Sequence, residues 1–287
     1  MNKHDFFISA AEVKLPKIIY GTAWKKDGTA SLVELAIETG FRGIDTACQP
    51  KHYHEAGVGE GIAACIRRGI VHRPELYLQS KFTPLDGQDP NRIPYNPNGD
   101  LADQIATSFR VSLSNLQTDY LDGLILHSPL ATPQQTHEAW LAMEKLVISG
   151  GVKQLGVSNC YDIRIFEDLY TKADIKPAIL QNRFYANTGY DRELRAFCLQ
   201  NEVIYQSFWT LTANPHVLAN ANLLDIAKQY GRSPAQVFFR YLSQIGIVPL
   251  TGTTSPLHMR EDLAIVDFEL SPDECKTIEG LLKVLSV

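Results

Sequence analysis

The chain has 287 residues, of which 45% are hydrophobic and 21% are charged, and its formal net charge is -5. This composition is ordinary for a globular protein, and the negative charge argues against a general nucleic-acid binder. Small molecules are therefore the expected partners, and we expect a monomer or a weak homo-oligomer. The five cysteines, an odd number without C-x-x-C spacing, are expected to be reduced thiols.

The N-terminus and the course of the chain indicate where the protein resides and how it is divided. The segment Met1–Ile8 lacks the long apolar stretch of a signal peptide. No apolar run approaches the roughly 20 residues of a membrane span. No Gly/Ser-rich or Pro-rich linker interrupts the chain. We therefore predict a cytoplasmic protein, without membrane binding, in which residues 1–287 form a single domain.

Short apolar runs alternate with helical patterns along the chain. A hairpin is expected around residues 6–17, and eight candidate strands follow at 18–21, 43–45, 76–81, 121–127, 154–158, 178–181, 203–207 and 247–250. Between the strands, apolar residues recur at three- and four-residue spacing, as at Ile105, Phe109, Leu113 and Leu116. Strand-helix alternation with apolar strands predicts an α/β fold of parallel strands covered by helices. The strand count fits a closed barrel or a doubly wound sheet.

Helix starts and one long loop complete this layout. Ser233-Pro234 and Ser271-Pro272 each place a capping residue before a proline at the first helical position, and the second pair starts a helix beyond the eighth strand-helix unit. The segment 83–99 contains four prolines and is expected to be one long loop after the third strand. In a barrel, that loop lies on the catalytic rim.

Four segments near strand ends carry a polar residue suited to proton chemistry: Asp45, Tyr53, Lys81 and His127. A buried lysine needs a partner, so Asp45 and Lys81 are expected to form an ion pair. An ammonium near a phenol favours phenolate, which predicts that Tyr53 exchanges protons near neutral pH. A neutral His127 would orient a carbonyl oxygen beside that phenol. This set suits the reduction of an aldehyde or ketone, for which a cofactor must supply the hydride.

Five motifs in order resemble those of the aldo-keto reductases, over nearly the whole chain. They are Gly-Phe-Arg-Gly-Ile-Asp45-Thr-Ala, Ser80-Lys81, Leu-Ile-Leu-His127-Ser-Pro, Gly-Val-Lys-Gln-Leu-Gly-Val-Ser158-Asn159 and Val248-Pro-Leu-Thr-Gly-Thr-Thr. The resemblance implies a (β/α)8 TIM barrel with an N-terminal β-hairpin and an extra C-terminal helix. It also implies an NAD(P)H-dependent carbonyl reductase or alcohol dehydrogenase that binds its cofactor without a Rossmann fold.

The resemblance further implies roles for individual residues. Asp45, Tyr53, Lys81 and His127 would form the catalytic tetrad, with Tyr53 as the general acid. The positions that match cofactor-binding residues are Ser158, Asn159 and Gln181 for the nicotinamide carboxamide, Ser207, Trp209 and Leu211 for the pyrophosphate, and Thr253, Thr254, His258 and Asp262 for the adenosine phosphate end. Trp24 and Phe82 are expected to contact the substrate.

The chain departs from the family pattern at several of these positions. Tyr53 follows Asp45 by eight residues instead of the usual five. Gly252 and His258 stand where many relatives carry a lysine and an arginine that bind the 2'-phosphate, so NADPH is expected and NADH is an alternative. Gln206 occupies the position of the aromatic residue on which the nicotinamide usually stacks, and Phe208 is a candidate substitute.

Two alternative functions remain open at this point. The chain could be a non-catalytic, dinucleotide-binding regulatory or interaction protein on the same barrel, although a binder has no need of a proton donor paired with a lysine. It could also be a metal-dependent barrel hydrolase. Metal-binding barrels generally add paired carboxylates at strand ends, and this sequence lacks that pattern, so no metal is expected. The identity of the substrate depends on loops whose shapes the sequence does not give.

Overall fold

The computed structural model describes residues 6–283, and its centre is a closed barrel of eight strands that are all parallel to their neighbours. The strand order around the barrel is β10-β3-β4-β5-β6-β7-β8-β9. The strands are β3 (Ile19–Gly21), β4 (Gly43–Asp45), β5 (Tyr77–Phe82), β6 (Gly123–Leu126), β7 (Leu155–Ser158), β8 (Ile179–Arg183), β9 (Ile204–Phe208) and β10 (Val248–Thr251). The predicted (β/α)8 barrel is thus confirmed, and the doubly wound alternative is wrong.

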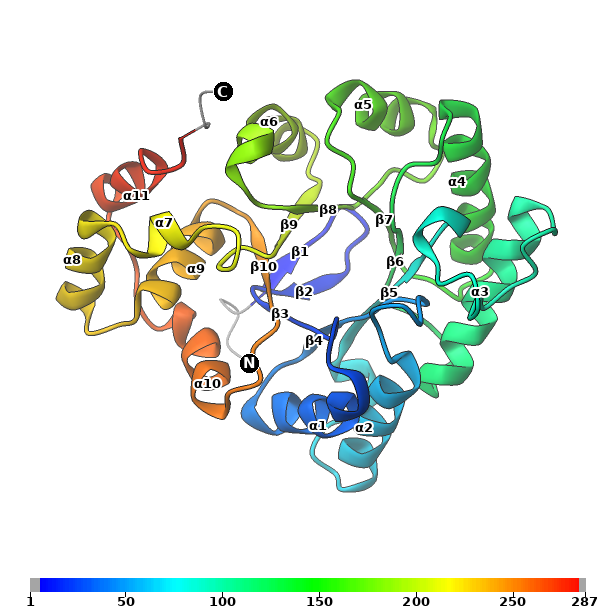
Figure 1. The fold of residues 1–287 in the computed structure, drawn as a ribbon, viewed down its shortest axis with the longest axis horizontal. Helices are drawn as coiled ribbons and strands as arrows, with labels where there is room; N and C mark the ends of the chain where they lie inside the picture. Colours follow the sequence, from blue (N-terminus) through cyan, green and yellow to red (C-terminus); the bar gives the residue numbers. More distant parts are fainter. Residues whose placement is uncertain (1–5, 284–287) are drawn as a thin grey trace.

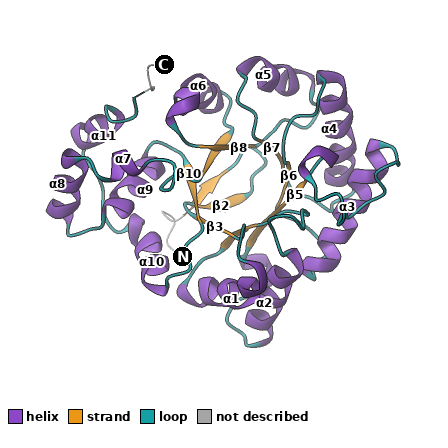
Figure 2. Ribbon diagram, viewed as in Figure 1, coloured by secondary structure: helices purple, strands orange, loops and turns teal. Residues whose placement is uncertain are grey.

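The barrel strands alternate with an outer ring of helices (Figures 1 and 2). The ring consists of α1 (Thr29–Thr39), α2 (Glu55–Arg67), α3 (Leu101–Leu116), α4 (Pro133–Ile148), α5 (Ile163–Lys172), α6 (Arg192–Gln200), α9 (Pro234–Gln244) and α10 (Pro256–Leu263). The strands are buried on both faces, inside by one another and outside by the helices, which explains their apolar runs. No helix within residues 6–283 is long and apolar enough to cross a membrane.

Two additions to the ring were expected from the sequence, and the structure contains both. The hairpin strands β1 (Phe6–Ile8) and β2 (Lys14–Pro16) pair antiparallel, and Val13 and Leu15 pack with residues from several barrel strands, so the hairpin closes one end of the barrel. The helix α11 (Pro272–Glu279) lies beyond the eighth unit, and Ser271 forms a capping box with Glu274 at its start. Two further helices, α7 (Pro215–Leu218) and α8 (Ala221–Tyr230), precede α9.

The long loop 83–99 lies between β5 and α3 and contains only one turn of 3-10 helix, η3 (Leu85–Gly87). Its own polar groups hold it on the barrel rim. The hydroxyl of Tyr95 donates to the Thr83 carbonyl at 2.7 Å, and the side-chain amide of Gln88 donates to the Cys48 carbonyl at 3.0 Å. The loop is therefore fixed to the ends of β4 and β5, next to the strand-end residues that the sequence singles out.

Candidate active site

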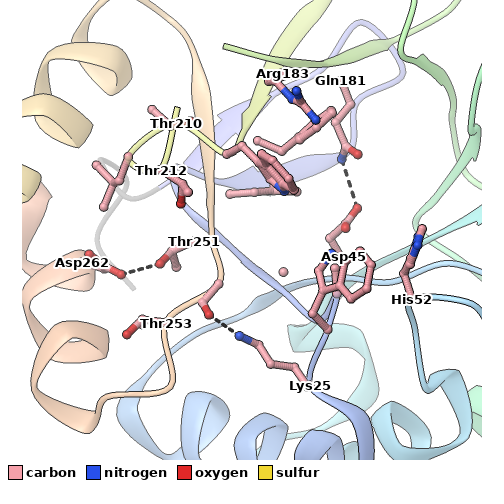
Figure 3. Close-up of a pocket in the computed structure, with 18 of the residues that line it drawn as sticks. Lys25, Asp45, His52, Gln181, Arg183, Thr210, Thr212, Thr251, Thr253 and Asp262 are labelled. Atoms are coloured by element: carbon pink, nitrogen blue, oxygen red, sulfur yellow. Dashed lines mark hydrogen bonds between the residues drawn. The ribbon is translucent and has the colours of Figure 1, made fainter. Parts of the chain in front are cut away.

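A cavity of about 1180 Å³ opens at the end of the barrel where the strands finish. Residues that follow or end the barrel strands line it from every side, so segments distant in sequence meet there (Figure 3). The lining includes most of the positions predicted to be functional: Trp24, Asp45, Tyr53, His127, Ser158, Asn159, Gln181, Trp209, Leu211, Thr253, Thr254, His258 and Asp262. The site occupies the carboxyl end of the strands, as in other barrels of this type.

Asp45 and Lys81 form a buried ion pair at the bottom of this cavity. The Lys81 Nζ lies 2.6 and 2.7 Å from the two carboxylate oxygens of Asp45, and it also donates to the Thr46 carbonyl at 2.9 Å. The two residues are only 2% and 1% exposed. Burial lowers the pKa of Lys81, and the attraction of Asp45 opposes that effect. The predicted pairing is therefore present in the structure.

Three glutamine side chains supply the rest of the environment of Asp45. The side-chain amide nitrogens of Gln79 and Gln181 donate to Asp45 Oδ1 at 2.6 and 3.0 Å. Both also donate to the side-chain oxygen Oε1 of Gln206, at 2.9 and 2.8 Å. Gln206 completes the ring by donating to Gln79 at 3.1 Å. Gln206, at the position of the family's stacking aromatic, is thus buried in a polar network, while Phe208 lines the cavity.

Tyr53 lies beside this ion pair, although it comes eight residues after Asp45. Lys81 Nζ is 5.2 Å from the centre of the Tyr53 ring, and the ring meets His127 edge-on with centroids 6.1 Å apart. Among the described residues, none hydrogen-bonds to the Tyr53 hydroxyl, whose side chain lines the cavity. The lengthened loop therefore still delivers the phenol to the site.

The expectation that Lys81 lowers the pKa of Tyr53 needs correction. Burial raises the pKa of Tyr53 well above its usual value, and the negative charge of Asp45 raises it further. The ammonium of Lys81 donates its hydrogen bonds to Asp45 and to the Thr46 carbonyl, and the Asp45 carboxylate largely neutralises its charge. Tyr53 is consequently a neutral phenol, a form that can donate a proton.

Glu55, two residues after Tyr53, anchors the same loop to the barrel. It is the first residue of α2 and is 5% exposed. Its carboxylate accepts hydrogen bonds from the hydroxyls of Ser80 and Ser112 and from Asn115 at 3.1 Å. Ser80 immediately precedes Lys81 in β5, so the start of α2 is tied to the strand that carries the ion pair. This anchor fixes Tyr53 in place despite the longer spacing.

His127 follows β6 and is held by Thr83 from the end of the neighbouring strand. Its Nδ1 lies 2.6 Å from the Thr83 hydroxyl. Burial lowers the pKa of His127 well below its usual value, and the charges of Lys81 and His52 add to the effect. The imidazole is therefore neutral. Thr83 is only 2% exposed, and the tautomer with the proton on Nε2 gives its hydroxyl an acceptor.

The two predicted substrate-contacting residues have different locations. Trp24 is 56% exposed and stacks on His52 with ring centroids 4.0 Å apart, and both rings line the cavity. Phe82 lies outside the lining: it is 1% exposed, belongs to the hydrophobic core and packs against Tyr95. Successive residues of a strand face opposite ways, so Lys81 faces the barrel interior and Phe82 the helices. His52 also lines the cavity, although the sequence analysis assigned it no role.

The residues predicted to hold the nicotinamide end come from neighbouring strands. Ser158 ends β7, and Asn159 follows it with a left-handed backbone conformation (φ 53°). The Asn159 amide donates to the His127 carbonyl at 2.8 Å and to the Ser158 hydroxyl at 3.2 Å. Gln181, the third residue of this group, donates to Asp45. The structure thus brings the three together at the ends of β7 and β8, with Gln181 bound to Asp45 and Asn159 bound to the His127 carbonyl.

The residues predicted for the phosphate end come mainly from the segments after β9 and β10. Trp209, Leu211, Thr253, Thr254, His258 and Asp262 line the cavity, whereas Ser207 is buried and accepts a hydrogen bond from Thr210. Asp262 accepts from the Thr251 hydroxyl at 2.7 Å, and burial raises its pKa to about 6. Residues 6–283 contain no group of three or more His, Cys, Asp or Glu side chains placed to hold a metal ion.

Lys25 is a cavity residue that the sequence analysis did not identify. It lies in the segment after β3, yet its Nζ hydrogen-bonds to the carbonyl of Gly252, in the segment after β10 (Figure 3). A Cβ added to Gly252 would lie 3.7 Å from this nitrogen. Burial lowers the pKa of Lys25. Residue 252 is not a lysine, but it has the ammonium group of Lys25 beside it, supplied from the segment after the neighbouring strand β3.

Comparisons with known proteins agree with the resemblance. Residues 17–283 match the family model described as the aldo/keto reductase family. The uncharacterized oxidoreductase YtbE of Bacillus subtilis is 34% identical over 278 residues, covering 96% of this chain and 92% of that protein. Glyoxal reductase of Bacillus subtilis is 33% identical over 251 residues, with coverage of 88% and 82%. In fold, the chain resembles a Bombyx mori aldo-keto reductase in complex with NADP (TM-score 0.81, 24% identity, coverage 96% and 92%).

The contact between Thr83 and His127 predicts the tautomer of the imidazole. Nitrogen-15 NMR of the histidine-labelled protein is expected to show His127 with its proton on Nε2. In Thr83→Val, which removes the hydroxyl at nearly constant volume, the two tautomers are expected to become mixed, because the difference of about 1–3 kcal/mol for an unpaired buried hydroxyl is lost. Thr83→Ser should restore the original spectrum. A wild-type spectrum with the proton on Nδ1 would contradict this assignment.

Proposed function

The chain belongs to the aldo/keto reductase family of oxidoreductases, and from that premise we propose that it reduces a small aldehyde or ketone to an alcohol with NADPH. The observation that carries the proposal is the buried Asp45–Lys81 pair beside a neutral Tyr53 and a neutral His127. Asp45, Tyr53 and His127 line one cavity, with Lys81 bound to Asp45, and the volume of about 1180 Å³ leaves room for a dinucleotide and a small carbonyl compound.

In this proposal the substrate carbonyl oxygen lies between the Tyr53 hydroxyl and the imidazole of His127. The Nε2 proton of His127 orients the oxygen and stabilises the negative charge that develops there. Tyr53 donates its proton to the same oxygen as the alcohol forms. A bound reduced nicotinamide supplies the hydride to the carbonyl carbon. Ser158, Asn159 and Gln181 are the residues that would hold its carboxamide.

The ion pair acts on Tyr53 after the proton has left. The ammonium of Lys81, whose Nζ is 5.2 Å from the ring centre, attracts the phenolate and so offsets part of the cost that burial and Asp45 place on it. Asp45 and the glutamine amides keep Lys81 charged and fixed in a place that is otherwise costly for an ammonium group. Glu55 holds the Tyr53 phenol beside the Lys81 ammonium group through its hydrogen bonds to Ser80 and Ser112.

NADPH is the proposed cofactor because a cation remains at the phosphate end. Gly252 and His258 remove the usual lysine and arginine, but Lys25 places an ammonium group at the Gly252 carbonyl. Thr253 and Thr254 line the same part of the cavity, and the N-terminus of α10 follows them. Ser207, Trp209 and Leu211 are proposed to contact the pyrophosphate segment.

The rival function, a dinucleotide-binding regulator without catalysis, has less support. A binding protein does not need a proton donor next to a buried lysine, and the set of Asp45, Lys81, Tyr53 and His127 is complete in this chain.

We further propose that residues 1–287 act as one domain, because segments from the β1–β2 hairpin to α11 contribute to a single barrel and its covering helices.

Replacement of the acid tests the proposed reaction. In Tyr53→Phe, the steady-state rate of aldehyde reduction with NADPH is expected to fall roughly 10²- to 10⁴-fold, because the proton donor is lost. Tyr170→Phe, on the outer helix α5, serves as the control and should keep full activity. Unchanged turnover in Tyr53→Phe would remove this residue from the mechanism.

The raised pKa of Tyr53 and the lowered pKa of His127 predict that the wild-type rate stays flat from about pH 7 to about pH 10.

Replacement of Lys25 tests the choice of cofactor. In Lys25→Met, the KM for NADPH is expected to rise about tenfold, and the KM for NADH to change less than about threefold, because only NADPH carries the 2'-phosphate. Lys26→Met removes an exposed neighbouring charge and should alter neither value. An equal rise for both cofactors would assign Lys25 to the pyrophosphate, which they share.

A further inference from the structure

Arg183 is a cation on the cavity wall that the proposed mechanism does not use. It is the last residue of β8, two positions beyond Gln181, so both side chains lie on the interior face of the strand. Asn182, between them, faces outward and hydrogen-bonds to Asp191 at 2.7 Å. Figure 3 shows Arg183 next to Gln181, on the opposite side of the view from Asp262.

Aromatic rings hold the guanidinium of Arg183, and no carboxylate pairs with it. Its Cζ lies 4.3 Å from the centre of the Trp209 ring and 5.1 Å from that of Tyr185. Within residues 6–283, the structure shows no ion pair or hydrogen bond for this guanidinium. Other arginines of the chain, such as Arg73, are paired with carboxylates. The rings leave the hydrogen-bonding edge of Arg183 without a protein acceptor.

The carboxylates in the same cavity are already engaged or located elsewhere. Asp45 is neutralised by Lys81 and is further hydrogen-bonded by Gln79 and Gln181. Glu261 and Asp262 belong to α10, at the end of the cavity that is proposed to hold the adenosine phosphate, and Asp262 already accepts a hydrogen bond from Thr251. A guanidinium with free donors therefore lies on the cavity wall beside Gln181, the residue that hydrogen-bonds to Asp45 (Figure 3). An oxyanion is the ligand that its planar fork of donors fits best.

We propose that Arg183 binds an anionic group, a carboxylate or a phosphate ester, on the carbonyl substrate, and that it selects aldehydes or ketones that carry such a group. This inference rests on the carbonyl reduction proposed above and adds the substrate class. Arg183 would hold the far end of the substrate while the carbonyl oxygen lies at Tyr53 and His127.

The test compares matched substrates in wild type and in Arg183→Met. The first pair is para-carboxybenzaldehyde and its methyl ester, and the second is glyceraldehyde phosphate and glyceraldehyde. Arg183→Met is expected to lose about tenfold or more in kcat/KM for the anionic member that the wild type prefers, and less than about threefold for its neutral partner. The pair that shows the loss identifies carboxylate or phosphate as the group bound.

Two further variants control for charge and for folding. Arg183→Lys keeps the charge without the planar fork and should retain part of the preference. Arg232→Met removes an arginine that stacks on Phe268 outside the cavity and should leave the preference unchanged. Circular dichroism and the rate with the neutral aldehyde show that each variant is folded.

Equal losses for the anionic and neutral members would overturn the inference, as would no loss for either. A rise in the KM for NADPH with an unchanged preference would overturn it as well and would assign Arg183 to the cofactor phosphates. These outcomes leave carbonyl reduction intact, because the wild type still reduces the neutral aldehydes. If the wild type reduces none of the four compounds and no other carbonyl compound, the proposed function fails and the inference fails with it.

Discussion

The buried ion pair of Asp45 and Lys81 is the interaction on which the rest of the site depends. Moving two charges into the barrel costs several kcal/mol per ion, and only close geometry with further hydrogen bonds recovers that cost. Lys81 meets both carboxylate oxygens and a backbone carbonyl, and Gln79 and Gln181 add two amide donors to Asp45. The charge of Lys81 is therefore fixed in position before any substrate arrives, which is the condition for electrostatic catalysis.

Two neighbouring groups are positioned relative to this pair by separate anchors. Glu55 ties the loop that carries Tyr53 to Ser80, next to Lys81, and to Ser112 in α3. Thr83, the residue after β5, holds the imidazole of His127. Both anchors attach to the end of β5, the strand that carries Lys81. Tyr53 and the imidazole of His127 are therefore held in fixed positions relative to Lys81. The neutral state of both groups follows from their burial.

The sequence predicted the barrel and several of these contacts because each had a local signal. The eight strands appeared as short apolar runs, and the structure places each within about two residues of its expected bounds. The capping boxes at Ser233 and Ser271 are present at the expected helix starts. Asp45 and Lys81 could be paired from the sequence because a buried charge at a strand end requires a partner.

Other features depend on how distant segments meet, and no local pattern reports that. The hydrogen-bonded side chains of Gln79, Gln181 and Gln206 come from three strands. The sequence around Gln206 does not indicate that its amide lies next to Gln79. Lys25 contacts Gly252 because β3 and β10 are neighbours in the closed barrel, although the two residues are more than two hundred positions apart in sequence. Phe82 was expected to contact the substrate, yet strand alternation turns its side chain toward the helices. The pKa of Tyr53 rises because burial and Asp45 outweigh a lysine whose donors are already engaged.

The measurement that tests the central claim most directly is the rate of hydride transfer in Asp45→Asn, followed as the single-turnover loss of NADPH absorbance at saturating aldehyde. The amide keeps the shape of Asp45 but leaves Lys81 without its counter-charge. The account predicts a fall of about tenfold or more in this rate, because Lys81 loses its counter-charge beside Tyr53. The Kd for NADPH should stay within about twofold of the wild-type value, because the amide oxygen of the new asparagine can still accept from Gln181. An unchanged rate in a folded variant would contradict the account.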